Sequence, residues 1–171
     1  MQPRDWIRFA ALGMVALGVY GLVWAGESKS SDQTKRDVNK VKLEWIEYGA
    51  ALQRAEEEDK HILIDFYTKW CGWCKVMDRR TYTDPTVIQM LKDNFVISKV
   101  NAESAKKFEV GDSQMSGRDL ARQFGVTSFP MTWFLKPDGT RIANIAGYFP
   151  PERFVKALEY VQERQYVKKD E

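Results

Sequence analysis

The sequence predicts an α/β domain built on a mixed β-sheet and preceded by an apolar N-terminal segment. Two observations predict this fold class. Short apolar runs typical of buried strands alternate with stretches of helical periodicity, which favours parallel strands joined by helices. The last two strand-like runs flank Pro-Asp-Gly at 137–139, a turn signal that indicates an antiparallel pair. The length of 171 residues fits one such domain with appendages.

The N-terminus has the pattern of an export segment. Arg4 and Arg8 precede an uncharged apolar run from Phe9 to Ala25, and a positive start before an apolar stretch is typical of a signal peptide. The run is also near the lower limit of a membrane span, about 17 residues. We expect residues 1–25 to be either a cleaved signal peptide or a retained membrane anchor that touches the membrane through residues 9–25. The rest of the chain is then expected outside the cytoplasm.

Composition separates a tether from the domain and excludes some classes of protein. Residues 26–40 are polar, charged and without periodicity, so we expect a tether leading to a domain over residues 41–171. The 26 Lys and Arg residues nearly balance the 24 Asp and Glu residues, which argues against a dedicated nucleic-acid-binding protein. Two cysteines and one histidine exclude a four-ligand Cys/His zinc site.

The elements of the domain follow from periodicity and from capping residues. Helical spacing of aromatic and apolar residues predicts a first helix that includes Trp45, and Asp84 followed by proline predicts the start of another. Ser116 with Asp119 resembles a capping box. The predicted strands are 62–67, 95–101, 131–135 and 140–146; the predicted helices are 45–55, 71–81, 85–94, 116–125 and a final one containing 154–161. We expect the stretch 102–115 to be a surface insertion, and His61 to be a polar residue at a strand edge.

The chemistry concentrates in one Cys-x-x-Cys motif, Cys71-Gly72-Trp73-Cys74, placed between a buried strand and a helix. A free thiol has a pKa of about 8.5, and the unpaired N–H groups at a helix start favour the reactive thiolate. Two intervening residues let Cys74 reach Cys71, so a disulfide can close and reopen. We expect Cys71, at the exposed helix start, to attack, and Cys74 to resolve the mixed disulfide. The alternatives are a structural disulfide or two inert thiols; a two-residue loop gives the former little stabilisation.

These motifs resemble the thioredoxin superfamily, and in particular its exported thiol–disulfide interchange proteins. Residues 64–66, Ile-Asp-Phe, and 70–72, Trp-Cys-Gly, are similar to the family's active-site strand and motif. Residues 99–101 resemble the next central strand, and residues 129–132, Phe-Pro-Met-Thr, resemble the cis-proline segment. The resemblance covers roughly Val41 to Val167 and implies a thioredoxin fold, with helices on both faces of the sheet.

The resemblance also implies roles for individual residues. Asp65 would be a buried carboxylate behind Cys74 that exchanges its proton, with Lys99 beside it; the alternative is that Asp65 only caps backbone groups. Pro130 would be cis and pack against the cysteines, and the backbone of Phe129 would bind a client segment by strand addition. Trp70 and Trp73 are further candidates for client binding on their own chemistry: Trp70 as a flat apolar wall beside the site, and Trp73, where thioredoxins carry proline, as apolar surface next to Cys71 or else as packing.

The direction of the reaction and the partners are expectations of the same kind. Family oxidases and isomerases usually carry histidine at the position of Trp73, and its absence here favours a reductase. We expect protein thiol and disulfide clients, a membrane electron donor, and no cofactor beyond the Cys71–Cys74 disulfide, because no nucleotide-binding motif is present. The alternatives are an oxidase or isomerase, or a Cu(I) carrier that uses the same cysteines as soft ligands.

Overall fold

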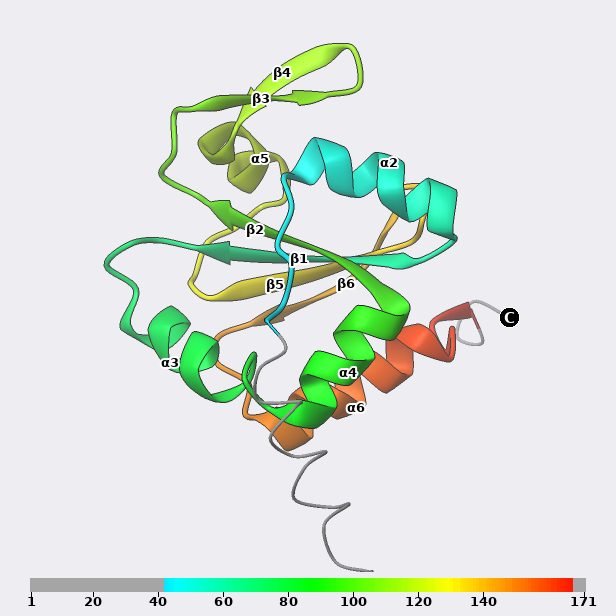
Figure 1. Cartoon of the computed structure of the whole chain (residues 1–171). Helices are drawn as coiled ribbons and strands as arrows, with labels where there is room; N and C mark the ends of the chain where they lie inside the picture. Colours follow the sequence, from blue (N-terminus) through cyan, green and yellow to red (C-terminus); the bar gives the residue numbers. More distant parts are fainter. Residues whose placement is uncertain (1–41, 168–171) are drawn as a thin grey trace, which may run out of the picture.

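A four-stranded mixed sheet forms the centre of the molecule (Figure 1). The computed structural model describes residues 42–167, so the predicted export segment and the whole predicted tether lie outside the described residues. The strands are β1 (His61–Tyr67), β2 (Phe95–Asn101), β5 (Met131–Leu135) and β6 (Arg141–Ala146), in the order β2-β1-β5-β6. β1 pairs parallel with β2, whereas β5 pairs antiparallel with both β1 and β6. The predicted mixed sheet is confirmed.

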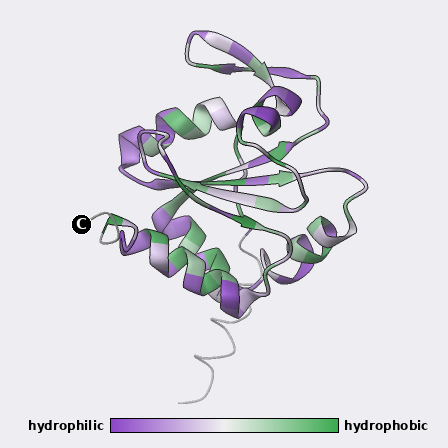
Figure 2. Cartoon of the chain, turned by 180° about the vertical axis from the view of Figure 1, so that it is seen from behind, coloured by the Kyte–Doolittle hydropathy of each residue, from purple (hydrophilic) through white to green (hydrophobic). Residues whose placement is uncertain are grey.

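Helices cover both faces of this sheet (Figure 1). The helices are α2 (Tyr48–Glu58), α3 (Gly72–Arg80), α4 (Pro85–Asn94), α5 (Gly117–Gln123) and α6 (Pro151–Gln162). Neighbouring side chains of β1 point to opposite faces: Ile64 packs in the core with α2 and α5, whereas Leu63 packs in the core with α3, α4 and α6. The helices carry hydrophilic and hydrophobic stripes in Figure 2, as expected of a two-sided α/β layer arrangement. Within residues 42–167, no helix has the length and apolar character needed to cross a membrane.

The helix starts follow the capping residues. Asp84 accepts hydrogen bonds from the backbone N–H groups of Thr86 and Val87 at the start of α4, directly before the proline at its first position. Ser116 and Asp119 form a reciprocal capping box at the start of α5. Both predicted caps are confirmed.

Residues 45–47 were predicted as the start of the first helix, and this prediction is wrong. Helix α2 begins only at Tyr48, and the preceding segment, including Trp45, is extended along the outer edge of β2. There the backbone N–H of Ile46 donates to the carbonyl of Ile97 at 3.1 Å. Pairing with the outer edge of β2 therefore keeps this segment extended, although Trp45 continues the helical spacing of the apolar residues in α2.

The stretch 102–115 contains a β-hairpin, which the sequence interpretation missed. Its strands are β3 (Lys107–Val110) and β4 (Ser113–Ser116), joined at Gly111, whose φ is +56°. The hairpin packs on α2 so closely that a Cβ atom on Gly49 would lie 1.8 Å from the carbonyl oxygen of Glu109. The insertion is thus part of the folded layer over α2.

His61 is also placed differently from the prediction. It is buried, and its Nε2 lies 2.9 Å from the hydroxyl of Tyr166. The turn after α6 returns to the start of β1, so the residue is covered rather than exposed at an edge.

Candidate active site

The two cysteines lie where β1 leads into α3. Cys71 is the N-cap residue of α3, Cys74 lies in its first turn, and the two form a disulfide with Cα atoms 5.3 Å apart. The backbone N–H of Cys74 donates to Sγ of Cys71 at 3.0 Å. An unpaired N–H of the first helical turn is therefore directed at the Cys71 sulfur, the arrangement that favours negative charge on that atom after reduction.

The expectation that Cys71 is the exposed cysteine is wrong for this disulfide form. The exposed fractions of Cys71 and Cys74 are 4% and 3%, so both cysteines are buried. The N-cap position turns the Cys71 sulfur back onto the helix start instead of into solvent. Position in the helix, and not exposure, is what distinguishes the two sulfurs here.

The surface around the disulfide is aromatic. Trp70 and Trp73 are 67% and 61% exposed, unusually high for large apolar side chains. Trp73 stacks on Tyr148, with ring centroids 5.5 Å apart and an angle of 23° between the planes. The indole of Trp70 meets the ring of Phe129 edge to face, with centroids 5.9 Å apart. Two aromatic pairs thus stand beside the cysteine motif.

The loop after β2 fixes one of these pairs. Nε1 of Trp70 donates to a carboxylate oxygen of Glu103 at 2.9 Å, and the carbonyl of Glu103 accepts from Arg118 at 3.2 Å. Sequence reasoning missed Glu103, because it lies in the stretch interpreted as an insertion. Tyr148 was also missed as a site residue, although it follows Gly147 within the family resemblance.

The segment before β5 faces the same site. The Phe129–Pro130 peptide bond is cis, and the carbonyl of Pro130 accepts from the backbone N–H of Gly147 at 2.8 Å. Between residues 42 and 167, no backbone hydrogen bond involves Phe129. Its backbone groups are therefore available for an extended segment of another chain.

Asp65, which is buried, and Lys99, which is half-buried, form an ion pair on neighbouring strands. They are direct partners in the β1–β2 register, and Nζ of Lys99 lies 3.2 Å from a carboxylate oxygen of Asp65. Asp65 is 1% exposed. Lys99 also pairs with Asp78 of α3, the helix that begins at the cysteines. A continuous chain of charged contacts therefore connects β1 to the active-site helix.

Burial controls the protonation of this carboxyl. The pKa of Asp65 is raised to about 6, mainly by desolvation; the attraction of Lys99 opposes this rise and the negative charge of Asp78 adds to it. The other carboxylate oxygen of Asp65 has no hydrogen-bond partner within the described part of the chain. Burial, and the charge of Asp65, also raise the pKa of Tyr82 well above its usual value, so that phenol stays protonated at neutral pH. Asp65 can therefore gain or lose a proton close to neutral pH.

Sequence reasoning brought Asp65 and Lys99 together but missed Asp78 and Tyr82. Asp78 stands four residues after Cys74, one helical turn further along α3, and that spacing is the signal that could have found it. Tyr82 lies beyond the end of α3, and no local pattern indicates that its ring lies beside Lys99 on β2.

Comparison with known proteins supports the same reading of the fold. Residues 48–162 match the family model described as a thioredoxin-like domain. The chain belongs to the thioredoxin-like domain family. The predicted resemblance to thiol–disulfide interchange proteins is confirmed.

Individual relatives agree with this family. The thiol:disulfide interchange protein DsbD of Pseudomonas fluorescens is 24% identical over 143 residues, which cover 82% of this chain but 23% of that protein. A thioredoxin from Thermus thermophilus is 27% identical, with a TM-score of 0.59, over 71% of this chain and 88% of that one. The reduced C-terminal domain of DsbD from Neisseria meningitidis is 26% identical, with a TM-score of 0.50, over 64% of this chain and 90% of that domain. This thioredoxin-like family member thus spans less than a quarter of the DsbD protein from Pseudomonas.

Proposed function

We propose that this protein is a thiol–disulfide oxidoreductase that reduces protein disulfides outside the cytoplasm through Cys71 and Cys74. The observation that carries the proposal is the redox pair at the start of α3, where a backbone N–H is directed at the Cys71 sulfur. The family and the interchange proteins among its relatives support the reaction type.

The first step uses the reduced pair. The Cys71 thiolate attacks one sulfur of a client disulfide, a new S–S bond joins Cys71 to the client, and the second client sulfur leaves as a thiolate. The client segment lies extended beside Phe129, between the pairs Trp70–Phe129 and Trp73–Tyr148. Apolar contact with the exposed indoles holds the client while the bonds exchange.

The second step resolves the mixed disulfide. Cys74 gives its proton to the Asp65 carboxylate and attacks Sγ of Cys71, and the bound client sulfur leaves as a thiolate that takes a proton from water. The Cys71–Cys74 disulfide forms, and two electrons have passed to the client. Asp65 suits this role because its pKa of about 6 makes the carboxyl a stronger base than an exposed aspartate while leaving it ionised at pH 7.

Regeneration needs a dithiol donor. We propose that a membrane protein supplies these electrons, because the sequence has no nucleotide-binding motif through which the chain could take them from a soluble cofactor. The predicted export segment, residues 1–25, would place the domain on the same side of the membrane as its clients.

Turnover of a model disulfide tests the function. The full chain, supplied with dithiothreitol, should accelerate reduction of insulin disulfides, and Cys71→Ser should return the rate to that of dithiothreitol alone. A matched control is Ser113→Ala, an exposed change on the hairpin far along the chain from the motif. Equal rates for the unchanged protein and Cys71→Ser would refute the proposal. Copper titration of the reduced chain, with the same cysteine variants, tests the carrier alternative.

A further inference from the structure

The ammonium group of Lys99 lies within a cage of three aromatic rings. Its Nζ is 5.1 Å from the ring centroid of Trp45, 5.4 Å from that of Tyr67 and 5.3 Å from that of Tyr82. Trp45 and Tyr82 also meet edge to face, with centroids 4.9 Å apart. Aromatic faces attract a cation, and most strongly where water is excluded. We call Trp45, Tyr67 and Tyr82 the lysine cage.

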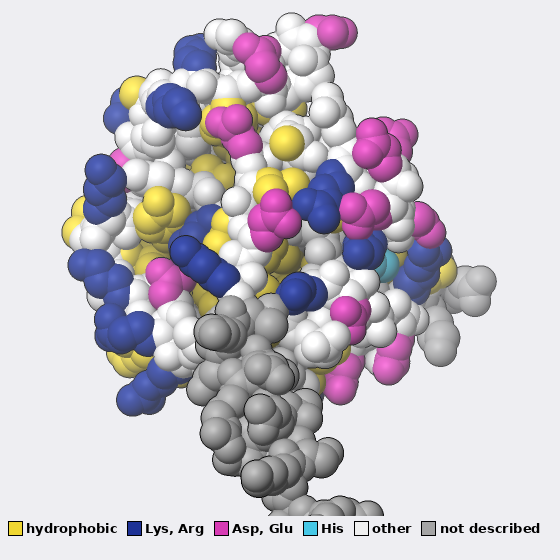
Figure 3. All heavy atoms as spheres, viewed as in Figure 1, with side chains coloured by type: hydrophobic (Ala, Val, Ile, Leu, Met, Phe, Trp, Pro, Cys, Tyr) yellow, Lys and Arg dark blue, Asp and Glu magenta, His cyan; other side chains and the backbone are white. Residues whose placement is uncertain are grey.

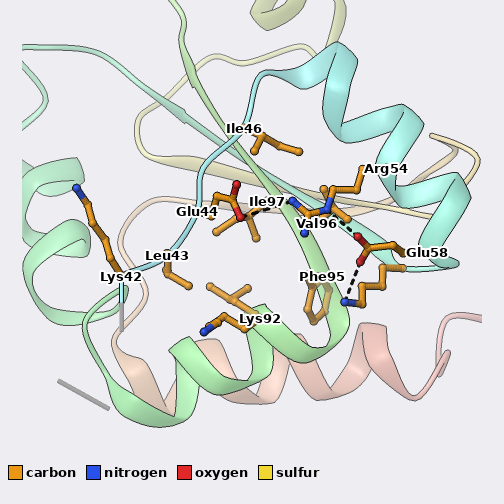
Figure 4. A pocket seen from close by; sticks show the side chains of 12 residues that line it. Lys42, Leu43, Glu44, Ile46, Arg54, Glu58, Lys92, Phe95, Val96 and Ile97 are labelled. Carbon is orange, nitrogen blue, oxygen red and sulfur yellow. Dashed lines mark hydrogen bonds and ion pairs between the residues drawn. The ribbon is translucent and has the colours of Figure 1, made fainter. Parts of the chain in front are cut away.

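Trp45 differs from the other two members of the lysine cage because it lies on the segment that precedes the first described helix, α2. It belongs to the extended segment 42–47 that crosses the outer edge of β2 (Figure 4). Tyr67 and Tyr82 are fixed by β1 and by the turn after α3, whereas Trp45 depends on the anchorage of its own segment.

Three contacts hold that segment in place. Leu43 is buried in the core beside α4 and α6, and the backbone N–H of Ile46 donates to the carbonyl of Ile97. The carboxylate of Glu44 lies 3.6 Å from the guanidinium of Arg54, which in turn pairs with Glu58 (Figure 4). These contacts lie on both sides of Trp45 along the chain. The same segment borders a groove of about 210 Å³ on the edge of β2, and none of the proposed catalytic residues lines it.

We propose that Trp45 is a positioning residue that closes the Lys99–Asp65 pair off from water and so sets the pH range in which Asp65 exchanges its proton. Lys99 remains bonded to both Asp65 and Asp78 if the Trp45 ring is removed, so its position changes little. The main consequence is that water reaches the pair. Water stabilises the ionised carboxylate, and the carboxyl therefore releases its proton at a lower pH.

Three other titratable groups influence the protonation of Asp65. Lys99 faces it from β2, Asp78 from α3 and Tyr82 from the turn after α3. The residue paired with it on β5 is Thr132, which carries no charge. Desolvation is the largest influence on the pKa of Asp65, and it raises that pKa. Loss of a ring that excludes water should therefore lower the pKa of Asp65.

The test is a carboxyl titration in the disulfide form, which needs no catalytic turnover. The full chain, kept in solution with a nonionic detergent, is labelled with ¹³C-aspartate, and the Asp65 signal is assigned from its loss in Asp65→Asn. In Trp45→Ala, we expect the titration midpoint to fall by about one pH unit. Trp45→Phe keeps a ring face and should titrate like the unchanged protein.

The control is Val155→Ala, a partly buried apolar residue of α6 that packs against the same core but belongs neither to the segment 42–47 nor to the lysine cage. It should leave the Asp65 midpoint in place even if it lowers stability as much as Trp45→Ala does. If Trp45→Ala does not fold, Trp45→Leu carries the test with the same expected direction. An unchanged midpoint in a folded Trp45→Ala or Trp45→Leu variant overturns the proposal, as does an equal fall in Val155→Ala.

The inference rests on the proton-transfer role of Asp65 in the proposed function, and the two can fail separately. The pH profile of disulfide reduction is measured on the same variants. If the carboxyl midpoint falls while the pH profile stays unchanged, Trp45 acts on Asp65 as proposed and it is the catalytic use of Asp65 that fails.

Discussion

The backbone N–H of Cys74 donates to the sulfur of Cys71 across the first turn of α3. The two cysteines are almost equally buried in the disulfide form, so this contact is what makes them chemically different. An N–H directed at the Cys71 sulfur stabilises its thiolate after reduction, whereas the Cys74 sulfur lies one turn into the helix.

We therefore expect the reduced protein to be alkylated faster at Cys71 than at Cys74 below pH 7. Iodoacetamide labelling followed by peptide mass spectrometry measures both rates in one sample. Cys74→Ser should accumulate mixed disulfides with clients, because the attacking thiol is present and the resolving thiol is not. Equal alkylation rates would contradict the assignment of Cys71 as nucleophile.

The buried carboxyl makes the stability of the fold depend on pH. The pKa of Asp65 is raised to about 6 in the folded state, above its value in the unfolded chain, so the folded state holds this proton more tightly. The contribution of Asp65 to stability is thus greatest below about pH 4, and it falls as the pH rises to about 6. We expect Asp65→Asn to lack this fall and to be more stable at pH 7 by up to about 3 kcal/mol.

Urea unfolding of the disulfide form at pH 4, 5.5 and 7 measures this difference. The control is Asp112→Asn, an exposed change at the tip of the hairpin, which should retain the fall seen in the unchanged protein. A variant Asp65→Asn that is less stable than the unchanged protein at pH 7 would assign Asp65 a structural, backbone-capping role.

The stacked pair Trp73–Tyr148 predicts a contribution to client binding. Trp73→Ala and Tyr148→Ala should each lower kcat/KM for a protein disulfide by about 3- to 10-fold, because an aromatic pair contributes about 0.5–1.5 kcal/mol beyond its buried area. Rates with a small disulfide, which cannot span the aromatic surface, should change less. The control is Val167→Ala, another exposed apolar side chain at the far end of the chain. Parallel losses for both substrates would show that the pair acts on the cysteines and not on the client.

Export is testable without the structure. A reporter enzyme that is active only outside the cytoplasm, joined after Glu171, should be active in cells, and N-terminal sequencing of the mature protein separates a cleaved signal from a retained anchor. Recovery of the native protein in the cytoplasmic fraction would contradict export.

Local signals in the sequence predicted most of the fold around the site. The strand before Cys71 and the cap at Asp84 depend on short-range chemistry, so the pattern and the structure agree there. Trp45 fits a helical pattern, but the free edge of β2 offers a hydrogen bond to the next residue, and that long-range contact decides its conformation.

The parts of the site that could not be predicted are contacts between distant segments. Glu103 and Trp70 are 33 residues apart, and no periodicity connects them. The same holds for the cage around Lys99, where an N-terminal residue meets the turn after α3. Figure 3 shows charged side chains spread over the face that carries this edge of the sheet, so no surface charge pattern points to the buried pair beneath.

The reduction potential of the Cys71–Cys74 pair tests the central claim most directly. Equilibration of the full chain with glutathione or dithiothreitol buffers, with the disulfide fraction read by thiol trapping, gives the value. A reductase requires a potential near that of thioredoxin, about −270 mV, and this is the result we predict. A potential near about −120 mV, typical of a strong oxidase of the same fold, would contradict the proposed direction of electron flow.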